Sequence, residues 1–246
     1  ELTSVTLPDS IESIEYRAFD YCTKIESVKL PKNLKTIGER AFENCSSLEN
    51  VIIPDNVTII GDKAFMICYD MKSITFGKNV TEIGEDAFGN CRSLTEIVIP
   101  DSVTHLGYGA FTTCTALAKV TLGNGITKIS PKTFIECIKL AEITIPDGVT
   151  EIGEKAFNYC PSLTKISLPD SITKIGKDAF YDCKNLTNIN IPESVTSIGA
   201  WAFNGCDSLT SVTIGDSVTS IGDYAFYGCS SLTSVVISDS VTSIGR

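Results

Sequence analysis

The chain repeats one pattern of apolar and polar positions every 23 residues, from Leu2 to Gly245. Each copy contains a cysteine, an apolar residue three positions later, and then two apolar residues separated by one position. Ile189 and Ile191 are such a pair, and their period of two and β-branched side chains predict a short strand. A period of this length is typical of a solenoid, in which each unit covers the apolar face of its neighbour.

A turn and a second extended segment follow the first strand. Most copies place a proline at the end of the strand, and because proline has no N–H to give to a ladder, the chain is expected to turn there. An acid or amide such as Asp101 often comes next, and we expect its side chain to bond back to its own turn. A segment close to V-T-x-I then carries Ile or Leu at its end and is predicted to extend again.

The last part of each copy leads to a phenylalanine and predicts one or two helical turns. Acids such as Glu85 and Asp223 begin this part, and acids favour the positive end of a helix. In one copy Ser130 and Pro131 supply a helix N-cap and a proline in the first helical position. The phenylalanines of successive copies are expected to stack inward as a ladder beside the cysteines.

The repeat resembles the BspA-like repeats of the leucine-rich repeat superfamily. Residues 191–206 carry the resemblance, with the sequence Ile-Pro-Glu-Ser-Val-Thr-Ser-Ile-Gly-Ala-Trp-Ala-Phe-Asn-Gly-Cys, and it covers the whole chain. It implies an α/β fold, a right-handed solenoid with a parallel β-sheet on the concave face and short helical turns opposite. It also implies a secreted or cell-surface protein of host-associated bacteria or mucosal protozoa, linked to adhesion.

Residues 1–246 are interpreted as a single leucine-rich repeat domain of about eleven repeats. Terminal repeats of a solenoid normally carry a polar cap, and neither end of this chain does. We therefore expect a fragment of a longer array, whose uncapped termini favour end-to-end self-association. No apolar run approaches the roughly 20 residues that span a membrane, so no membrane insertion is expected in this segment.

Ten cysteines stand 23 residues apart. Equivalent side chains in successive coils point the same way, which differs from the converging geometry of a disulfide, so we expect mainly free buried thiols. Occasional disulfide pairs are the alternative. The sequence has no C-x-x-C pair for zinc, and no metal site is predicted. The cysteines are Cys22, Cys45, Cys68, Cys91, Cys114, Cys137, Cys160, Cys183, Cys206 and Cys229.

Neither catalysis nor a cofactor is predicted. The one histidine, His105, falls at a position that faces solvent, and the serines and aspartates have no base beside them. A net charge of −10 argues against nucleic acid as a partner. No Lys or Arg occurs between Asn185 and Gly245, so stacked acids there suit calcium as one option, and solvated turn caps as the favoured one.

The aromatic residues of the last copies predict a partner-binding patch. Trp201 and Tyr224 hold the same position in adjacent copies, Tyr227 lies three residues further on, and Tyr181 is one copy away from Trp201. Such rings are favoured as interface anchors. The alternative is that they cover the helical layer or pack against another domain. The exposed strand positions are small and polar, which suits weak contact with a large partner.

Two functions remain open on the sequence. The first is an extracellular or cell-surface adhesion module that engages a host protein or glycan through its solenoid surface. The second is a structural spacer that holds another domain away from the cell surface and has no ligand of its own.

Overall fold

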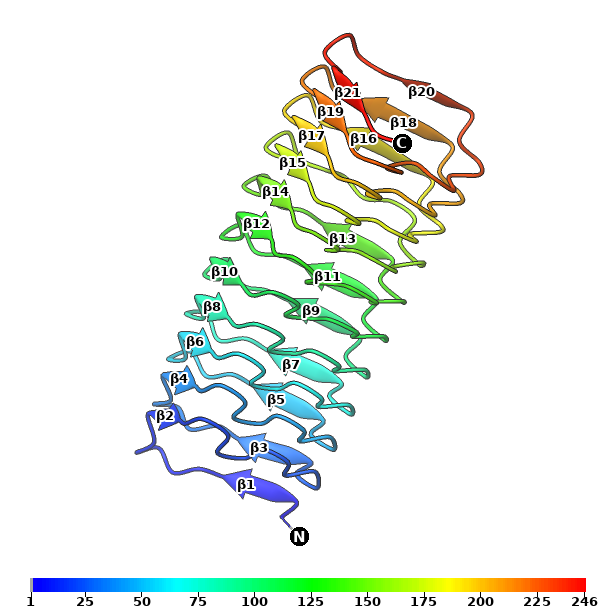
Figure 1. Cartoon of the computed structure of the whole chain (residues 1–246). Coiled ribbons are helices and arrows are strands. Elements are labelled where there is room, and N and C mark those ends of the chain that lie inside the picture. The colour runs from blue at the N-terminus through cyan, green and yellow to red at the C-terminus, as the bar shows by residue number, and fades with distance from the viewer. Residues whose placement is uncertain (1) are drawn as a thin grey trace.

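The computed structural model describes residues 2–246, which form one elongated stack of similar coils (Figure 1). Each coil has three sides. The first side contributes a ladder of longer strands, the second a ladder of two-residue strands, and the third a column of tight turns. All strand pairs are parallel. The structure therefore agrees with the predicted parallel solenoid of stacked coils.

The long-strand ladder contains ten strands, with Ser167 joining it through one isolated bridge to Thr144. It divides into pieces of four, three and three strands. The strands are β1 (Ser4–Thr6), β3 (Ser27–Lys29), β5 (Asn50–Ile52), β7 (Ser73–Thr75), β9 (Glu96–Val98), β11 (Lys119–Thr121), β13 (Glu142–Thr144), β16 (Asn188–Ile191), β18 (Ser211–Ile214) and β20 (Ser234–Val236).

The short-strand ladder contains eleven strands in pieces of five and six. They are β2 (Ser13–Ile14), β4 (Thr36–Ile37), β6 (Ile59–Ile60), β8 (Glu82–Ile83), β10 (His105–Leu106), β12 (Lys128–Ile129), β14 (Glu151–Ile152), β15 (Lys174–Ile175), β17 (Ser197–Ile198), β19 (Ser220–Ile221) and β21 (Ser243–Ile244).

One register holds throughout both ladders, because each residue pairs with the residue 23 positions away. Val5 pairs with Val28 in the long-strand ladder, and Ile198 pairs with Ile221 in the short-strand ladder. Along β16, Ile189 and Ile191 are buried while Asn188 and Asn190 are exposed. The period-two pattern therefore predicted correctly which side chains face the core.

The third side contains no helix within residues 2–246, so the predicted short helical turns are wrong. Two residues per coil have positive φ, for example Lys155 at 57° and Tyr159 at 59°. The Lys155 amide donates to Lys177 in the next coil at 2.9 Å, whereas the Asn158 amide donates locally to Lys155 at 3.2 Å. Alternate amides thus bond between coils, which an α-helix does not allow. With no helix, the described residues also offer none that could cross a membrane.

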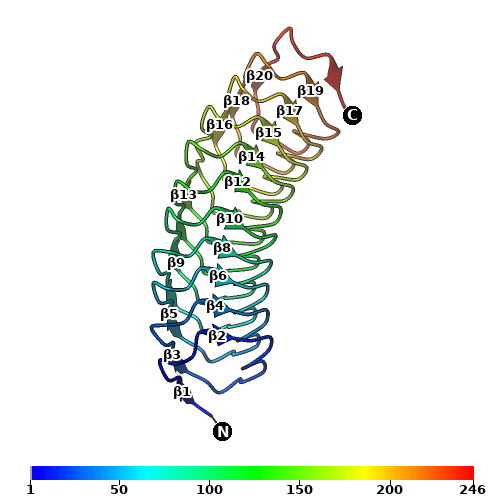
Figure 2. The same cartoon turned by 90° about the vertical axis from the view of Figure 1, so that its left-hand side faces the viewer.

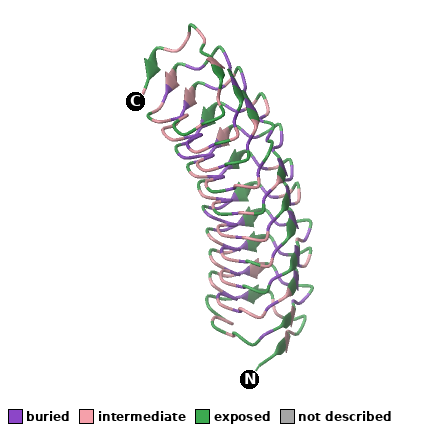
Figure 3. Cartoon of the chain, turned by 90° about the vertical axis from the view of Figure 1, so that its right-hand side faces the viewer, coloured by how far each residue is buried: buried purple, intermediate pink, exposed green. Residues whose placement is uncertain are grey.

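The sheet does not lie on the concave face, contrary to expectation. Figures 2 and 3 show a gentle bend of the stack, with the long-strand ladder on its outer side. Packed helices would need about 8–10 Å per coil and would force the sheet inward. The turns here repeat at the phenylalanine spacing of 5.1–5.9 Å, close to the roughly 4.8 Å of paired strands. No helices are present to widen the turn side and bend the sheet inward.

The turn acids bond to the next coil, and the prediction that they bond to their own turn is wrong. The Asp101 carboxylate accepts the backbone N–H of Asn124 at 2.7 Å, and the Glu193 carboxylate accepts that of Asp216 at 2.6 Å. Because these partners are 23 residues apart, each carboxylate links two coils. The acids therefore support the register.

The predicted phenylalanine ladder is confirmed. Successive rings lie 5.1–5.9 Å apart between centroids, with interplanar angles of 4–16°. Rings from Phe42 to Phe203 are fully buried, and Phe19 and Phe226 at the two ends are partly buried. Offset stacking of this kind adds to the free energy gained from burial.

The ten cysteines are free thiols, eight of them buried. Each thiol from Cys45 to Cys229 donates to the carbonyl oxygen of the phenylalanine in the preceding coil, at 3.2–3.3 Å for Cys45, Cys68 and Cys114. Burial raises the pKa of the Cys45, Cys114 and Cys183 thiols to about 12 from an ordinary value of 9.0. These three thiols are therefore neutral in the folded protein at physiological pH.

Stability is expected to fall in alkaline solution. Above about pH 9 the Cys114 thiol ionises in the unfolded state, whereas in the folded state it stays protonated up to about 12. The unfolded state therefore binds fewer protons and is stabilised relative to the folded state. Replacing Cys114 by Ser keeps a hydroxyl donor and removes one ionising group. Between pH 9 and 12, Cys114→Ser should lessen the fall in the free energy of unfolding by up to about 1.4 kcal/mol per pH unit. Denaturant unfolding at stepped pH measures this, and equal pH slopes in parent and variant would contradict it.

The left-handed turn positions make a second prediction. Thr113 has a φ of 55°, which is strained for a β-branched residue, and the equivalent positions hold Gly205 and Gly228 at φ of 70° and 76°. Thr113→Gly should raise the free energy of unfolding by roughly 1 kcal/mol. The matched control is Thr95→Gly, an exposed site without positive φ, which should destabilise. Thermal unfolding of both variants decides, and destabilisation by Thr113→Gly would show that the turn conformation is wrong.

Candidate binding surfaces

Three of the four predicted aromatic residues contact one another on the turn side. The Trp201 and Tyr224 rings stack with centroids 4.4 Å apart, and Tyr227 meets them edge-on at 6.4 and 5.8 Å. We call these three residues the aromatic cluster. Trp201 and Tyr224 both occupy the first left-handed position of their coils, with φ of 60° and 55°, so their side chains fall in one column. The backbone turn therefore builds the cluster.

The rings of the aromatic cluster differ in exposure. Tyr227 is 65% exposed, whereas Trp201 and Tyr224 are half-buried. Because Trp201 and Tyr224 stack along the solenoid axis, they cover one of each other's faces, and Tyr227 is the most open ring. Trp201 and Tyr224 are therefore shielded in part by each other.

Tyr181 lies apart from the aromatic cluster. It occupies the same register position as Tyr227 but two coils earlier, and Asn204 stands at that position in the coil between. Within residues 2–246, no ring lies in contact with Tyr181. Asn204 is 6% exposed, and its side-chain Nδ2 has no hydrogen-bond partner among the described residues. Tyr181 lies in the copy next to that of Trp201, but it occupies a different position within the repeat.

Charged residues of both signs lie beside the aromatic cluster. Asp223 is exposed directly before Tyr224, and no Lys or Arg occurs between Asn185 and Gly245. The Asp223 carboxylate accepts the backbone N–H of Arg246 at 2.9 Å. A hollow of about 320 Å³ at the end of the stack borders Tyr224 and Tyr227. Arg246 lines the same hollow, so a positive charge lies beside the exposed acid.

Other exposed tyrosines are scattered over the turn side and were missed by the sequence analysis. Lys132 lies over the Tyr108 ring at 4.9 Å, and a hydrogen bond that its ammonium donates to the Tyr108 side chain raises the pKa of Lys132. Arg92 covers the Tyr69 ring at 4.9 Å. In the sequence, Tyr69 and Tyr108 are tyrosines at repeat positions that are polar in most other copies. Neither contacts another aromatic ring among the described residues. They form no second aromatic cluster.

The long-strand face is polar and exposed at the positions expected from the alternation. Its exposed large apolar side chains are Ile52, Val98 and Val236, which are 71%, 63% and 75% exposed. These three lie in separate coils and make no continuous apolar patch. The long-strand face is therefore a broad polar surface without a cluster of apolar side chains that could anchor a partner.

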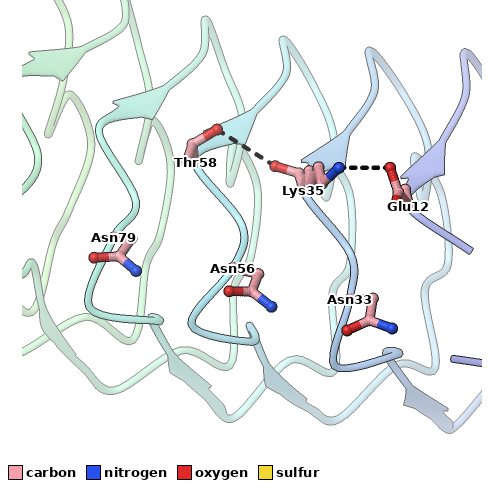
Figure 4. Close-up of a pocket in the computed structure, with 6 residues that line it drawn as sticks. All are labelled: Glu12, Asn33, Lys35, Asn56, Thr58 and Asn79. Carbon is pink, nitrogen blue, oxygen red and sulfur yellow. Dashed lines mark hydrogen bonds and ion pairs between the residues drawn. The ribbon is translucent and has the colours of Figure 1, made fainter.

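A polar hollow of about 490 Å³, here called the rim hollow, lies between the two strand ladders (Figure 4). The Lys35 ammonium pairs with the Glu12 carboxylate at 2.6 Å, and the Thr58 hydroxyl donates to the Lys35 carbonyl at 3.5 Å. Its lining residues are Glu12, Asn33, Lys35, Asn56, Thr58 and Asn79. The sequence analysis missed this hollow, although three asparagines at one repeat position were its signal.

The structure adds no grouping of catalytic or metal-binding side chains. His105 is exposed on β10. In the described part of the chain, no three His, Cys, Asp or Glu side chains are grouped so that they could hold a metal ion.

Comparison with known proteins identifies related sequences and structures. The model of the BspA type leucine rich repeat region matches residues 1–118, 41–164 and 150–246, which together span the chain. A leucine rich cell surface protein from Faecalibacterium prausnitzii is 31% identical, with 95% of this chain and 78% of that chain covered and a TM-score of 0.55. No curated protein matches the chain.

Two further solved structures are similar. A leucine-rich repeat protein from Bacteroides ovatus is 28% identical, with 98% of this chain and 91% of that chain covered and a TM-score of 0.50. The pneumococcal vaccine antigen PcpA is 26% identical, with 98% of this chain and 74% of that chain covered and a TM-score of 0.61. These neighbours share the stacked-coil architecture with this protein.

Proposed function

Because the chain belongs to the BspA-type leucine-rich repeat family, we propose that it is a secreted or cell-surface adhesion module that engages a host protein or glycan. The description of its Faecalibacterium neighbour as a cell surface protein supports this location. The extended solenoid supports binding to a large partner, because its long surface has few deep hollows. The aromatic cluster is the observation that carries the proposal.

The aromatic cluster has the properties of an interface anchor. Trp and Tyr carry much of the binding energy at protein interfaces, chiefly where several are packed together and partly desolvated. Within residues 2–246, the aromatic cluster is the one group of mutually contacting rings outside the phenylalanine core. Tyr227 offers its open ring, while the half-buried Trp201 and Tyr224 hold it in place. Tyr181, two coils before Tyr227 in the same column, is proposed as a second and separate contact with the same partner.

Truncating the aromatic cluster should weaken adhesion. Trp201→Ala, Tyr224→Ala and Tyr227→Ala together should reduce binding to epithelial cells or immobilised mucin at least tenfold, as loss of an anchor of about 2 kcal/mol would. Tyr227→Ala alone should reduce binding in the same direction with little change in stability, because that ring is 65% exposed. Equilibrium binding of labelled protein measures both effects.

A matched control replaces three scattered tyrosines, Tyr16, Tyr108 and Tyr159, by alanine. These are 56%, 39% and 44% exposed on the same side but make no cluster, so adhesion should be retained. Binding by the cluster variant equal to that of the parent would exclude the aromatic cluster as anchor. No binding by the folded parent would favour the spacer function instead.

The proposed function includes end-to-end self-association of the solenoid. Leu2 at one end of the stack is 52% exposed, and Ile237 and Ile244 at the other are 45% and 59% exposed. Two such end faces suit head-to-tail contact between copies, which forms open chains. Sedimentation of every sample at the binding concentration therefore accompanies the adhesion measurement, so that avidity is not mistaken for affinity.

A further inference from the structure

Three asparagines line the rim hollow at one register position in three consecutive coils. Asn33, Asn56 and Asn79 are all exposed, and Figure 4 shows their carboxamides oriented alike. The Nδ2 of Asn33 donates to the Asp9 carbonyl at 2.8 Å, and the Nδ2 of Asn56 donates to the Lys32 carbonyl at 2.8 Å. These bonds fix the side chains and leave each Oδ1 open as a hydrogen-bond acceptor.

Holding the coils together does not require asparagine at this position. Five of the seven later coils carry serine there and two carry glycine, and the Ser102 hydroxyl donates to the Val80 carbonyl at 2.7 Å. Ser194 does the same with Ile172 at 2.5 Å. These serines are partly buried and link successive coils without projecting from the surface. The asparagines make a comparable link and, in addition, present a row of acceptors to solvent.

The rim hollow has no unpaired charge. Its one cation, the Lys35 ammonium, is 2.6 Å from its one anion, the Glu12 carboxylate, and the other lining side chains are neutral. An anionic ligand would have to compete with Glu12, and a metal ion would have to compete with Lys35. The lining therefore favours a neutral ligand rich in hydrogen-bonding groups.

The spacing of the acceptors distinguishes a sugar from a peptide. Successive coils repeat at about 4.8 Å, whereas amides on one side of an extended peptide repeat every two residues, at roughly 6.6–6.8 Å. A peptide laid along the row would lose register within one coil. Sugar rings carry several hydroxyls, each both a donor and an acceptor, so they can meet acceptors at the coil spacing.

We propose that the rim hollow is a binding site for a neutral sugar chain that lies along the solenoid axis. Sugar hydroxyls donate to the Oδ1 atoms of Asn33 and Asn56. Asn79, whose side chain makes no hydrogen bond within residues 2–246, offers both its Oδ1 and its Nδ2. The site lies in the early coils and is separate from the aromatic cluster in the last coils, so it does not depend on the proposed adhesion anchor.

Nuclear magnetic resonance titration with neutral oligosaccharides tests this proposal. Lactose, N-acetyllactosamine and maltotriose are added to the nitrogen-15 labelled protein, and the side-chain amide signals of the rim asparagines are followed. At least one sugar should produce saturable shifts with a dissociation constant near 1 mM, as expected for a shallow polar site of about −4 kcal/mol. The exposed Asn188 and Asn190 signals should not move.

Serine variants provide the matched comparison. Asn33→Ser, Asn56→Ser and Asn79→Ser together copy the residue that later coils carry, so the fold is kept, and sugar affinity should fall at least tenfold. Asn188→Ser and Asn190→Ser should leave affinity unchanged. Absence of saturable shifts with all three sugars, equal affinity in the rim variant and the parent, or shifts caused by calcium chloride and not by sugars would each overturn the proposal.

Discussion

The structure depends on hydrogen bonds that join each coil to the next in a fixed 23-residue register. Short strands of two to four residues have little stability of their own, and a coil by itself leaves its apolar side chains open. Pairing residue with residue across coils satisfies backbone groups on all three sides. The same pairing aligns identical side chains in columns, so that phenylalanine meets phenylalanine and cysteine meets cysteine.

This constraint explains the turn side, where the protein differs most from a helix-bearing solenoid. An α-helix would keep its N–H groups for its own carbonyls. Here alternate amides reach the neighbouring coil, as the Phe157 amide does to Ala179 at 2.8 Å. Two residues per coil accept left-handed backbone conformations to allow this, at a cost of roughly 1–2 kcal/mol for each non-glycine residue. The inter-coil bonds and the buried phenylalanine column offset that cost.

Much of the fold could be predicted from the sequence, because the repeat fixes which side chains are equivalent. The two strand sets, the buried Ile189 and Ile191, and the phenylalanine column all followed from period and side-chain type. The helical turns did not, because an acid before Ala-Phe suits a helix and a stacked turn equally. Only the presence of a neighbouring coil decides between them. The expectation of a concave sheet failed for the same reason, since it assumed helices that would hold the coils far apart on the turn side.

The candidate sites, like the fold, could be predicted from the sequence only in part. The contact among Trp201, Tyr224 and Tyr227 was predictable because register placed two of them in one column and the third close by. Tyr181 does not join the aromatic cluster, because Asn204 occupies the same position in the next coil and separates Tyr181 from Tyr227. The rim hollow was not predicted, since its shape arises from how far asparagine projects compared with serine. Side-chain reach across coils is not visible in a repeat pattern.

Deleting one whole coil tests the register most directly. Removal of residues 115–137 joins Cys114 to Ile138 and keeps every other residue 23 positions from its partner, whereas removal of residues 115–136 shifts the seam by one position. The whole-coil deletion should unfold in one cooperative transition close to that of the parent, because each coil contacts only its neighbours. The deletion that is one residue shorter should lose several kcal/mol or split the transition, because a single-residue slip turns side chains to the opposite face. Equal stability of the two deletions in denaturant unfolding would contradict the account.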